Sequence, residues 1–190
     1  KIMLDIKKII NDSIDVKIKI LQNCIDQIKF ASEIMIKACK NDKKILWCGN
    51  GGSAADAQHM AAELMGGLRS HDRPPIASLA LTTDTSFITA WSNDTDYETI
   101  FSRQIEAIGH EGDVLIAIST SGNSKNVIRG INVAKKKGIY VIVLTGKSGG
   151  EMVELGDINI RIPSDDTQRI QEGHLMVEHI LCEYVEAYTV

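Results

Sequence analysis

Short, nearly all-apolar runs alternate with longer amphipathic segments along most of this 190-residue chain. Strands that are apolar on both faces are typical of a parallel sheet covered by helices, because parallel strands are normally joined by helical crossovers. The alternation predicts an α/β protein with a doubly wound, mostly parallel, five-stranded sheet flanked by helices. In such folds, ligands bind beyond the carboxyl ends of the strands.

The boundaries of these elements follow from the apolar runs and from the turn residues between them. Strands are predicted at 44–48, 76–81, 114–119, 140–145 and 158–162. Helices are predicted at 53–65, 83–91, 97–108, 124–137, 151–155 and 166–187.

Residues 12–40 carry apolar side chains at steps of three and four, which predicts one long amphipathic helix interrupted by Ser32. The stripe comprises Ile14, Ile18, Leu21, Ile25, Ile28, Met35 and Cys39. Residues 1–40 are therefore predicted to form a helical extension of a single domain whose core spans about 41–190. The stripe suits either helix pairing between subunits or an intrachain core contact, and the sequence leaves both open.

Composition excludes several classes of function. The formal net charge is -4 and the lysines are scattered, so there is no electrostatic reason to expect nucleic-acid binding. The four cysteines form no CxxC pair, which favours small buried side chains in a reducing compartment. No signal-peptide pattern and no run of about 18 apolar residues is present. We expect a cytoplasmic protein that neither enters nor binds a membrane.

The segment from Trp47 to Glu63 joins a glycine-rich turn to a helix. Gly49–Gly52 let the chain turn tightly, and Ser53 is predicted to be the N-cap of the helix. The N-terminus of a helix offers unpaired N–H groups and a positive dipole end, so a phosphate is a suitable ligand there. We call residues 49–53 the first loop.

His59 and Glu63 lie one turn apart on this helix, about 40° from each other at roughly 100° per residue. Both side chains can therefore reach one ligand, which points to acid–base or metal chemistry. Two other interpretations remain at this point. The pair can be an exposed i,i+4 contact, and Gly49, Gly51 and Ala54 also satisfy the loose dinucleotide-binding fingerprint.

A second hydroxyl-rich segment, residues 119–124, follows the apolar run 114–118 and precedes a predicted helix. Hydroxyls and main-chain amides at a helix N-terminus can hold a phosphate without a lysine. The alternative is an ordinary turn with an N-cap at Ser124. The chain has no GxxxxGK[ST] motif, which argues against a nucleotide triphosphatase. We call residues 119–124 the second loop.

Together these blocks resemble the sugar isomerase (SIS) domain family and, within it, the phosphoheptose isomerases. The resemblance covers nearly the whole chain. It rests on Cys48–His59 with Glu63, on Asn93-Asp94, on 112–115 with 118–124, on 144–147, and on Arg169–Glu172 with His174 and His179. Gln168 departs from those relatives in which this position is acidic, so no role is assigned to it.

The resemblance implies conversion of sedoheptulose 7-phosphate to D-glycero-D-manno-heptose 7-phosphate through an enediol, with Glu63 and His179 transferring the protons. The substrate-binding residues that it implies are Asn50, Gly51, Gly52, Ser53, Glu63, Asn93, Asp94, Gln171 and, for the phosphate, Ser119, Thr120, Ser121 and Ser124. It also implies one Zn2+ per subunit, held by His59, Glu63, Gln171 and His179. A homotetramer with active sites at subunit interfaces is implied as well.

Residue chemistry supports part of this assignment. Aldose–ketose exchange needs a base beside the carbonyl carbon and an acid for the enediol oxygen, and Glu and His suit these tasks. Helical geometry does not choose the histidine, because His179 lies about 80° from Gln171 and His174 about 60° the other way. The choice of His179 therefore rests on the family.

Three alternative functions remain. One is a non-catalytic SIS protein of the replication-initiator-associating type, but that relative lacks the acid and base that Glu63 and His179 supply here. Another is isomerisation of a different sugar phosphate. A dinucleotide oxidoreductase gives no role to His59, Glu63 or the second loop. The heptose product is expected to enter nucleotide-activated heptose biosynthesis, for lipopolysaccharide or for capsule, and the sequence does not choose between them.

Overall fold

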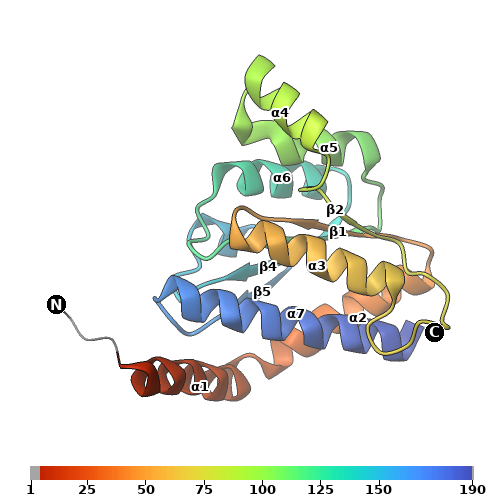
Figure 1. The fold of residues 1–190 in the computed structure, drawn as a ribbon. Coiled ribbons are helices and arrows are strands. Elements are labelled where there is room, and N and C mark those ends of the chain that lie inside the picture. Colours follow the sequence, from red (N-terminus) through yellow and green to blue (C-terminus); the bar gives the residue numbers. More distant parts are fainter. Residues whose placement is uncertain (1–4, 190) are drawn as a thin grey trace.

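A computed structural model describes residues 5–189 as one five-stranded sheet between two layers of helices (Figure 1). The strand order is β2-β1-β3-β4-β5, and all four pairings are parallel, which confirms the predicted sheet. The strands are β1 (Ile45–Cys48), β2 (Ser78–Ala80), β3 (Val114–Ile118), β4 (Tyr140–Thr145) and β5 (Ile158–Arg161).

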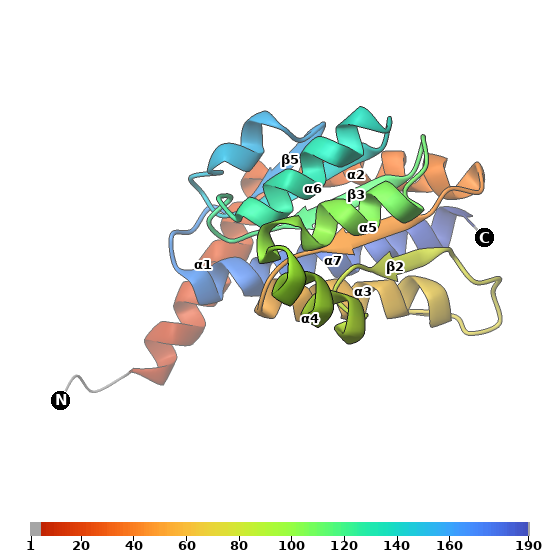
Figure 2. The same ribbon diagram turned by 90° about the horizontal axis from the view of Figure 1, so that it is seen from above.

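Alternate residues of the central strands β1, β3 and β4 face two separate apolar clusters, one on each side of the sheet. In β1, Ile45 and Trp47 join the first cluster, whereas Leu46 and Cys48 join the second. The first cluster is covered by α2 (Ile25–Lys40), α3 (Gly52–Gly66) and α7 (Thr167–Thr189). The second is covered by α5 (Ile100–Ile108) and α6 (Lys125–Lys136), with α4 (Thr85–Asp94) outside them (Figure 2).

The central strands β1 and β3 lie side by side, and the chain leaves them toward opposite faces of the sheet. Cys48 at the end of β1 is in register with Ala117 near the end of β3. From β1 the chain enters α3 on one face, and from β3 it enters α6 on the other. This is a topological switch point, and in doubly wound folds ligands bind there, beyond the carboxyl ends of the strands. The first and second loops follow β1 and β3 at this point.

The long N-terminal helix predicted over 12–40 is wrong, because the chain forms two helices, α1 (Ile6–Asn23) and α2, that meet at Cys24. Cys24 has φ -117° and ψ -2° and lies buried, with its thiol 3.5 Å from the carbonyl oxygen of Arg161 at the end of β5. Ser32 does not interrupt α2, since its hydroxyl donates to the carbonyl of Ile28. The helix break therefore coincides with a buried contact between Cys24 and the end of β5.

The predicted apolar stripe divides between these two helices. Ile28 and Met35 of α2 are buried in the first cluster, so an intrachain core contact accounts for this half. Ile14, Ile18 and Leu21 of α1 stay exposed. Figure 1 shows α1 projecting from the rest of the fold.

Several remaining boundaries differ slightly from the prediction. The strand predicted at 76–81 pairs only over Ser78–Ala80, and the helix predicted at 97–108 begins as a 3-10 turn, η1 (Tyr97–Thr99). The short helix near 151–155 is also a 3-10 turn, η2 (Glu151–Glu154).

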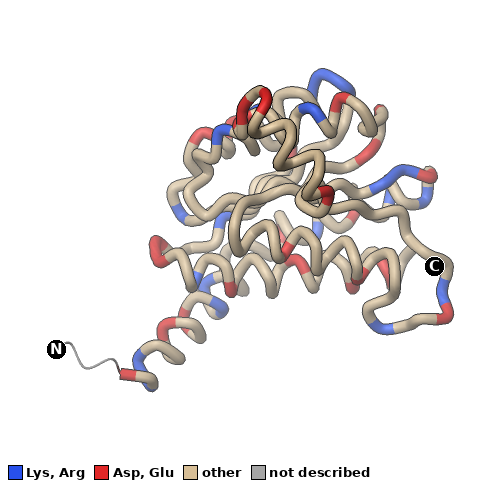
Figure 3. The backbone as a smooth tube through the Cα atoms, turned by 45° about the horizontal axis from the view of Figure 1, so that its top comes forward, with Lys and Arg blue, Asp and Glu red and all other residues tan. Residues whose placement is uncertain are grey.

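All four cysteines are free, and three of them are buried. No helix among residues 5–189 is long and apolar enough to cross a membrane. Basic and acidic residues are interspersed along the backbone (Figure 3).

Candidate active site

The first loop turns through a glycine in the left-handed region of backbone conformation. Gly51 has φ 56° and is the N-cap of α3, with no side-chain capping bond, so the prediction of Ser53 as N-cap is wrong. Ser53 lies buried inside the first turn, and its N–H donates to the carbonyl of Asn50 at 3.0 Å. Glycine at 51 allows a turn tighter than a serine cap provides, because it adopts positive φ without steric cost.

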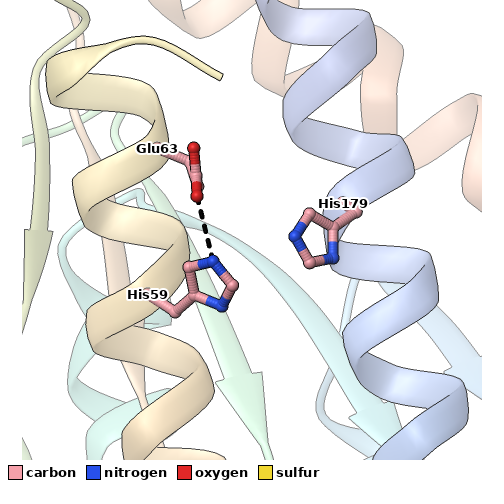
Figure 4. Close-up of side chains that lie close together, drawn as sticks. All are labelled: His59, Glu63 and His179. Carbon is pink, nitrogen blue, oxygen red and sulfur yellow. Dashed lines mark hydrogen bonds and ion pairs between the residues drawn. The ribbon is translucent and has the colours of Figure 1, made fainter. Parts of the chain in front are cut away.

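His59 and Glu63 of α3 face His179 of α7 across the interface between the two helices (Figure 4). His59 Nε2 is 2.9 Å from Glu63 Oε1, and the rings of His59 and His179 meet edge to face with centroids 5.0 Å apart. One ligand atom from each of the three residues lies within 4.8 Å of the others. The carboxylate and the imidazole of two distant segments therefore meet within a single chain.

The donor set of this cluster suits a divalent transition metal. Zinc in proteins is commonly held by imidazole nitrogen and carboxylate oxygen, and His59, Glu63 and His179 offer two nitrogens and one carboxylate. His179 Nδ1 is 2.9 Å from the carbonyl of Leu175, an outer hydrogen bond that orients the ring. The three residues fit the zinc that the family resemblance implies.

His174, the alternative left open by helical geometry, lies elsewhere. It is fully buried against the sheet, with Nε2 3.0 Å from the carbonyl of Thr145. Burial lowers the pKa of His174 to about 4, although the bond to Thr145 opposes this shift. His174 is therefore a neutral core histidine, and His179 is the one of the two that lies near Glu63.

Two further carboxyl groups surround the cluster. Burial raises the pKa of Asp56 on α3, although the neighbouring His59 and His179 oppose the shift. Burial also raises the pKa of Glu178 well above its usual value, and Asp56 adds to this effect. Both oxygens of Glu178 are without a hydrogen-bond partner among residues 5–189. The helix interface behind the cluster is therefore poor at stabilising negative charge.

The second loop gathers three serine hydroxyls at the carboxyl end of β3. Ser119 Oγ lies 3.0 Å from Ser124 Oγ and 3.4 Å from Ser121 Oγ, and it accepts from the N–H of Gly122 at 3.2 Å. Ser124 is the N-cap of α6 by position but makes no side-chain capping bond. The hydroxyls converge beside a helix N-terminus, as a phosphate site requires.

Gln171, near the start of α7, lies directly against the first loop. A Cβ placed on Gly52 would come 2.5 Å from Gln171 Nε2, so only glycine lets the amide approach the backbone this closely. Gln171 and Gly52, which are far apart in the sequence, are thus neighbours.

The remaining predicted site residues, Asn93, Asp94 and Thr120, make fewer side-chain contacts with the other predicted site residues. Asn93 Nδ2 donates to Asp94 Oδ1 at 2.8 Å, both residues are exposed, and neither side chain bonds to another predicted site residue within residues 5–189. Thr120 contributes its carbonyl, which accepts from the N–H of Gly146 at 3.0 Å.

Two residues beside the first loop are missing from the sequence-based set. Asn126 of α6 and Tyr97 of η1 both hydrogen-bond to the side chain of Asn50. Each is an ordinary polar residue near a helix start, so its residue type does not indicate this role. The one sequence feature that could have suggested Asn126 is its position two residues after the second loop.

Comparison with known proteins adds independent findings. Residues 10–146 match the SIS domain family. The chain is 50% identical over 183 residues to the phosphoheptose isomerase of Sulfurimonas denitrificans, covering 95% of this chain and 93% of that protein. It is 55% identical over 177 residues to phosphoheptose isomerase 2 of Campylobacter jejuni, covering 92% and 88%.

Two solved structures with a similar fold are also phosphoheptose isomerases. The phosphoheptose isomerase structure from Neisseria gonorrhoeae superposes with a TM-score of 0.91 at 41% identity, covering 96% of this chain and 97% of that chain. A phosphoheptose isomerase from Francisella tularensis superposes with a TM-score of 0.93 at 36% identity, covering 97% and 100%.

Proposed function

This chain belongs to the SIS domain family, and we propose that it is an aldose–ketose isomerase that converts sedoheptulose 7-phosphate to D-glycero-D-manno-heptose 7-phosphate. The observation that carries the proposal is the meeting of Glu63 with His179 in a chain that also carries two phosphate-type loops. The relatives named phosphoheptose isomerase, at about half identity over most of the chain, support the same activity.

The reaction needs one proton removed and one delivered at neighbouring atoms of the sugar. The Glu63 carboxylate would take the proton from C1 of the ketose, and His179 would protonate the carbonyl oxygen at C2, which produces the enediol. Return of a proton to C2, with loss of the hydroxyl proton at O1, completes the aldose. Glu63 lies 2.9 Å from His59, an imidazole that steadies the carboxylate for this task.

The rest of the substrate would be held by the two loops. The hydroxyls of Ser119, Ser121 and Ser124 suit the phosphate, with Thr120 beside them. Asn50, Gly51, Gly52 and Ser53 would contact the open-chain sugar, together with Gln171, Asn93 and Asp94. Binding the phosphate end fixes the reactive end near Glu63, which lowers the entropic part of the barrier.

A zinc ion is also proposed, held by His59, Glu63 and His179, with Gln171 as the fourth ligand that the family implies. When bound, the ion would act as a Lewis acid on the sugar carbonyl in place of a proton from His179, because both ring nitrogens of that residue would then be engaged.

We further propose a homotetramer with active sites lined by neighbouring subunits, acting in the cytoplasm at the first step of nucleotide-activated heptose biosynthesis. Within the chain, the exposed apolar face of α1 supports assembly. The competing function, a non-catalytic binding protein, needs neither Glu63 nor His179, so catalytic turnover separates the two.

The test is an assay of purified protein with ketose phosphates of five, six and seven carbons. We expect turnover of the seven-carbon sugar, and a fall of about 10²–10⁴-fold in kcat for Glu63→Gln. Glu183→Gln is the matched control, since Glu183 lies on α7 in a surface ion pair with Arg69. Solvent deuterium entering C1 at an unchanged rate in Glu63→Gln contradicts the base role.

The zinc proposal has its own measurement, elemental analysis of protein purified without chelator. One zinc per chain is expected, with loss of metal in His59→Ala and retention in His71→Ala, which removes an exposed histidine outside the cluster. Protein that contains no zinc and keeps full activity in chelator contradicts the proposed ligand set.

A further inference from the structure

The side chain of Asn50 is held by a reciprocal amide pair that links the first loop to α6. Asn50 Nδ2 donates to Asn126 Oδ1 at 2.9 Å, and Asn126 Nδ2 donates to Asn50 Oδ1 at 2.8 Å. Asn126 is buried, with 3% of its surface exposed, in the first turn of α6. This pair joins the segment after β1 to α6, which follows β3, at the switch point of the sheet.

The backbone sets the polarity of this pair. The N–H of Val127 donates to Asn126 Oδ1 at 2.9 Å, and a backbone N–H can only donate. The oxygen of Asn126 must therefore face Val127, and its amide nitrogen must face the oxygen of Asn50. The orientation of the Asn50 amide therefore follows from that of Asn126.

Tyr97 completes the arrangement from the opposite side. Its hydroxyl lies 2.8 Å from Asn50 Oδ1, which is thereby an acceptor for both Tyr97 and Asn126. A side-chain carbonyl oxygen has two lone pairs and both are used. Among residues 5–189, one N–H of Nδ2 is the part of the Asn50 side chain left without a partner.

We propose that Asn126 is a positioning residue that, with Tyr97, fixes Asn50 as a hydrogen-bond donor to an oxygen of the sugar. The proposal rests on the proposed function, in which Asn50 contacts the open-chain sugar. A group locked as a donor selects a carbonyl or hydroxyl oxygen as its partner. Because Asn126 follows Ser124 by two residues, the same turn that ends the phosphate loop also orients the sugar contact.

The first test is a double-mutant cycle on kcat/KM. Asn126→Ala is expected to lower kcat/KM about 10- to 100-fold, the scale of a misplaced contact. In an Asn50→Ala background the same change is expected to have less than about a twofold effect, because the residue through which Asn126 acts is gone. The inhibition constant of inorganic phosphate is expected to stay within about twofold, since the serine hydroxyls are untouched.

Two other variants serve as a second test and as a control. Tyr97→Phe removes only a hydroxyl and is expected to lower kcat/KM about 2- to 10-fold, the value of one hydrogen bond. Asn132→Ala changes an exposed asparagine on the same helix and is the matched control, with wild-type kinetics expected. If Asn126→Ala fails to fold, Asn126→Asp keeps the acceptor for Val127 but replaces the donor to Asn50 with a carboxylate oxygen, which repels Asn50 Oδ1 and is expected to displace the Asn50 amide.

A crystal structure of the Asn126 variant gives a readout that does not depend on activity. We expect the Asn50 amide to leave the pose in which its oxygen accepts from Tyr97. An unchanged Asn50 pose, wild-type kcat/KM in the variant, or a full effect in the Asn50→Ala background overturns the proposal. Absence of turnover by the wild-type enzyme contradicts the proposed function alone, and the crystallographic result then decides this inference.

Discussion

At the scale of single residues, the contact between Gly52 and Gln171 shows how a missing side chain shapes the site. Gly52 is the first residue of α3, and Gln171 approaches it from the first turns of α7. Any Cβ at 52 occupies the place of the Gln171 amide, which must then move. The glycine matters here for close approach, whereas Gly51 beside it is needed for its positive φ.

This contact predicts that Gly52→Ala lowers kcat/KM about tenfold or more, because the displaced Gln171 no longer meets the substrate correctly. Steady-state kinetics check the effect. Gly66→Ala is the control on the same helix, where an added Cβ meets nothing within 4 Å. That change is expected to keep activity and to stabilise the protein by about 0.5–1 kcal/mol. Wild-type kinetics in Gly52→Ala contradict a role for Gln171 in the site.

At the scale of elements, one buried carboxylate makes most of the polar contacts that attach the segment after α3 to the end of α7. Glu186 accepts from the backbone N–H groups of Leu68, Arg69 and Ser70 at 2.7–3.1 Å and pairs with Arg73 at 2.7 Å. Arg73 also donates to the carbonyl oxygen of Glu63 at 2.9 Å. The same contacts therefore hold the loop and the carboxyl end of the helix that carries Glu63.

The charge on Glu186 makes this attachment depend on pH. Burial alone raises the pKa of Glu186, but the Arg73 guanidinium and the three N–H groups outweigh it and lower the pKa to about 2. A carboxyl with a depressed folded-state pKa stabilises the protein above its unfolded pKa, near 4.5. That contribution is lost as the pH falls from about 5 toward 2.

We predict that Glu186→Gln lowers the free energy of unfolding by about 2–4 kcal/mol at pH 7, since it leaves buried donors and Arg73 without their anion. The difference from wild type is expected to shrink toward pH 2, as measured by urea unfolding across that range. Glu183→Gln, which touches the same loop through an exposed pair with Arg69, is expected to cost less than about 1 kcal/mol. A pH-independent difference contradicts the charge argument.

At the scale of the whole molecule, α1 projects from the rest of the fold and leaves one apolar face exposed (Figure 1). It buries Val16 and Ile20 against the core, but Ile6, Ile10, Ile14, Ile18 and Leu21 are 46–71% exposed. These five recur every three or four residues and form one stripe along the helix. An exposed apolar stripe of this kind marks an interaction surface, and in the proposed homotetramer another subunit would cover it.

We predict that the wild-type protein runs as a tetramer in light scattering, at about four times its 20.9 kDa chain mass. The double change Ile10→Gln and Ile14→Gln is expected to shift it to smaller species by removing apolar contact area. Lys8→Gln with Lys19→Gln is the control on another face of α1, with the mass unchanged. A stable wild-type monomer argues against shared active sites.

The sequence by itself determined the elements and the chemistry of the loops. Short apolar runs such as Leu115–Ala117 predicted buried parallel strands, because a strand apolar on both sides is stable only between two layers. The glycines at 49–52 and the hydroxyls at 119–124 predicted two loops at strand ends. These are local properties, set by the backbone preferences and polarity of neighbouring residues, so they can be predicted from the sequence.

Tertiary structure decided what depends on residues far apart in the chain. The helix break at Cys24 has no proline or glycine nearby and coincides with a buried contact to Arg161. His174 and His179 are equivalent by helical angle, and only packing sent the first into the core and the second to Glu63. The amide pair of Asn50 and Asn126 joins segments 76 residues apart. Such pairings depend on how the sheet orders its strands and on which faces its helices cover, and no local pattern encodes that order.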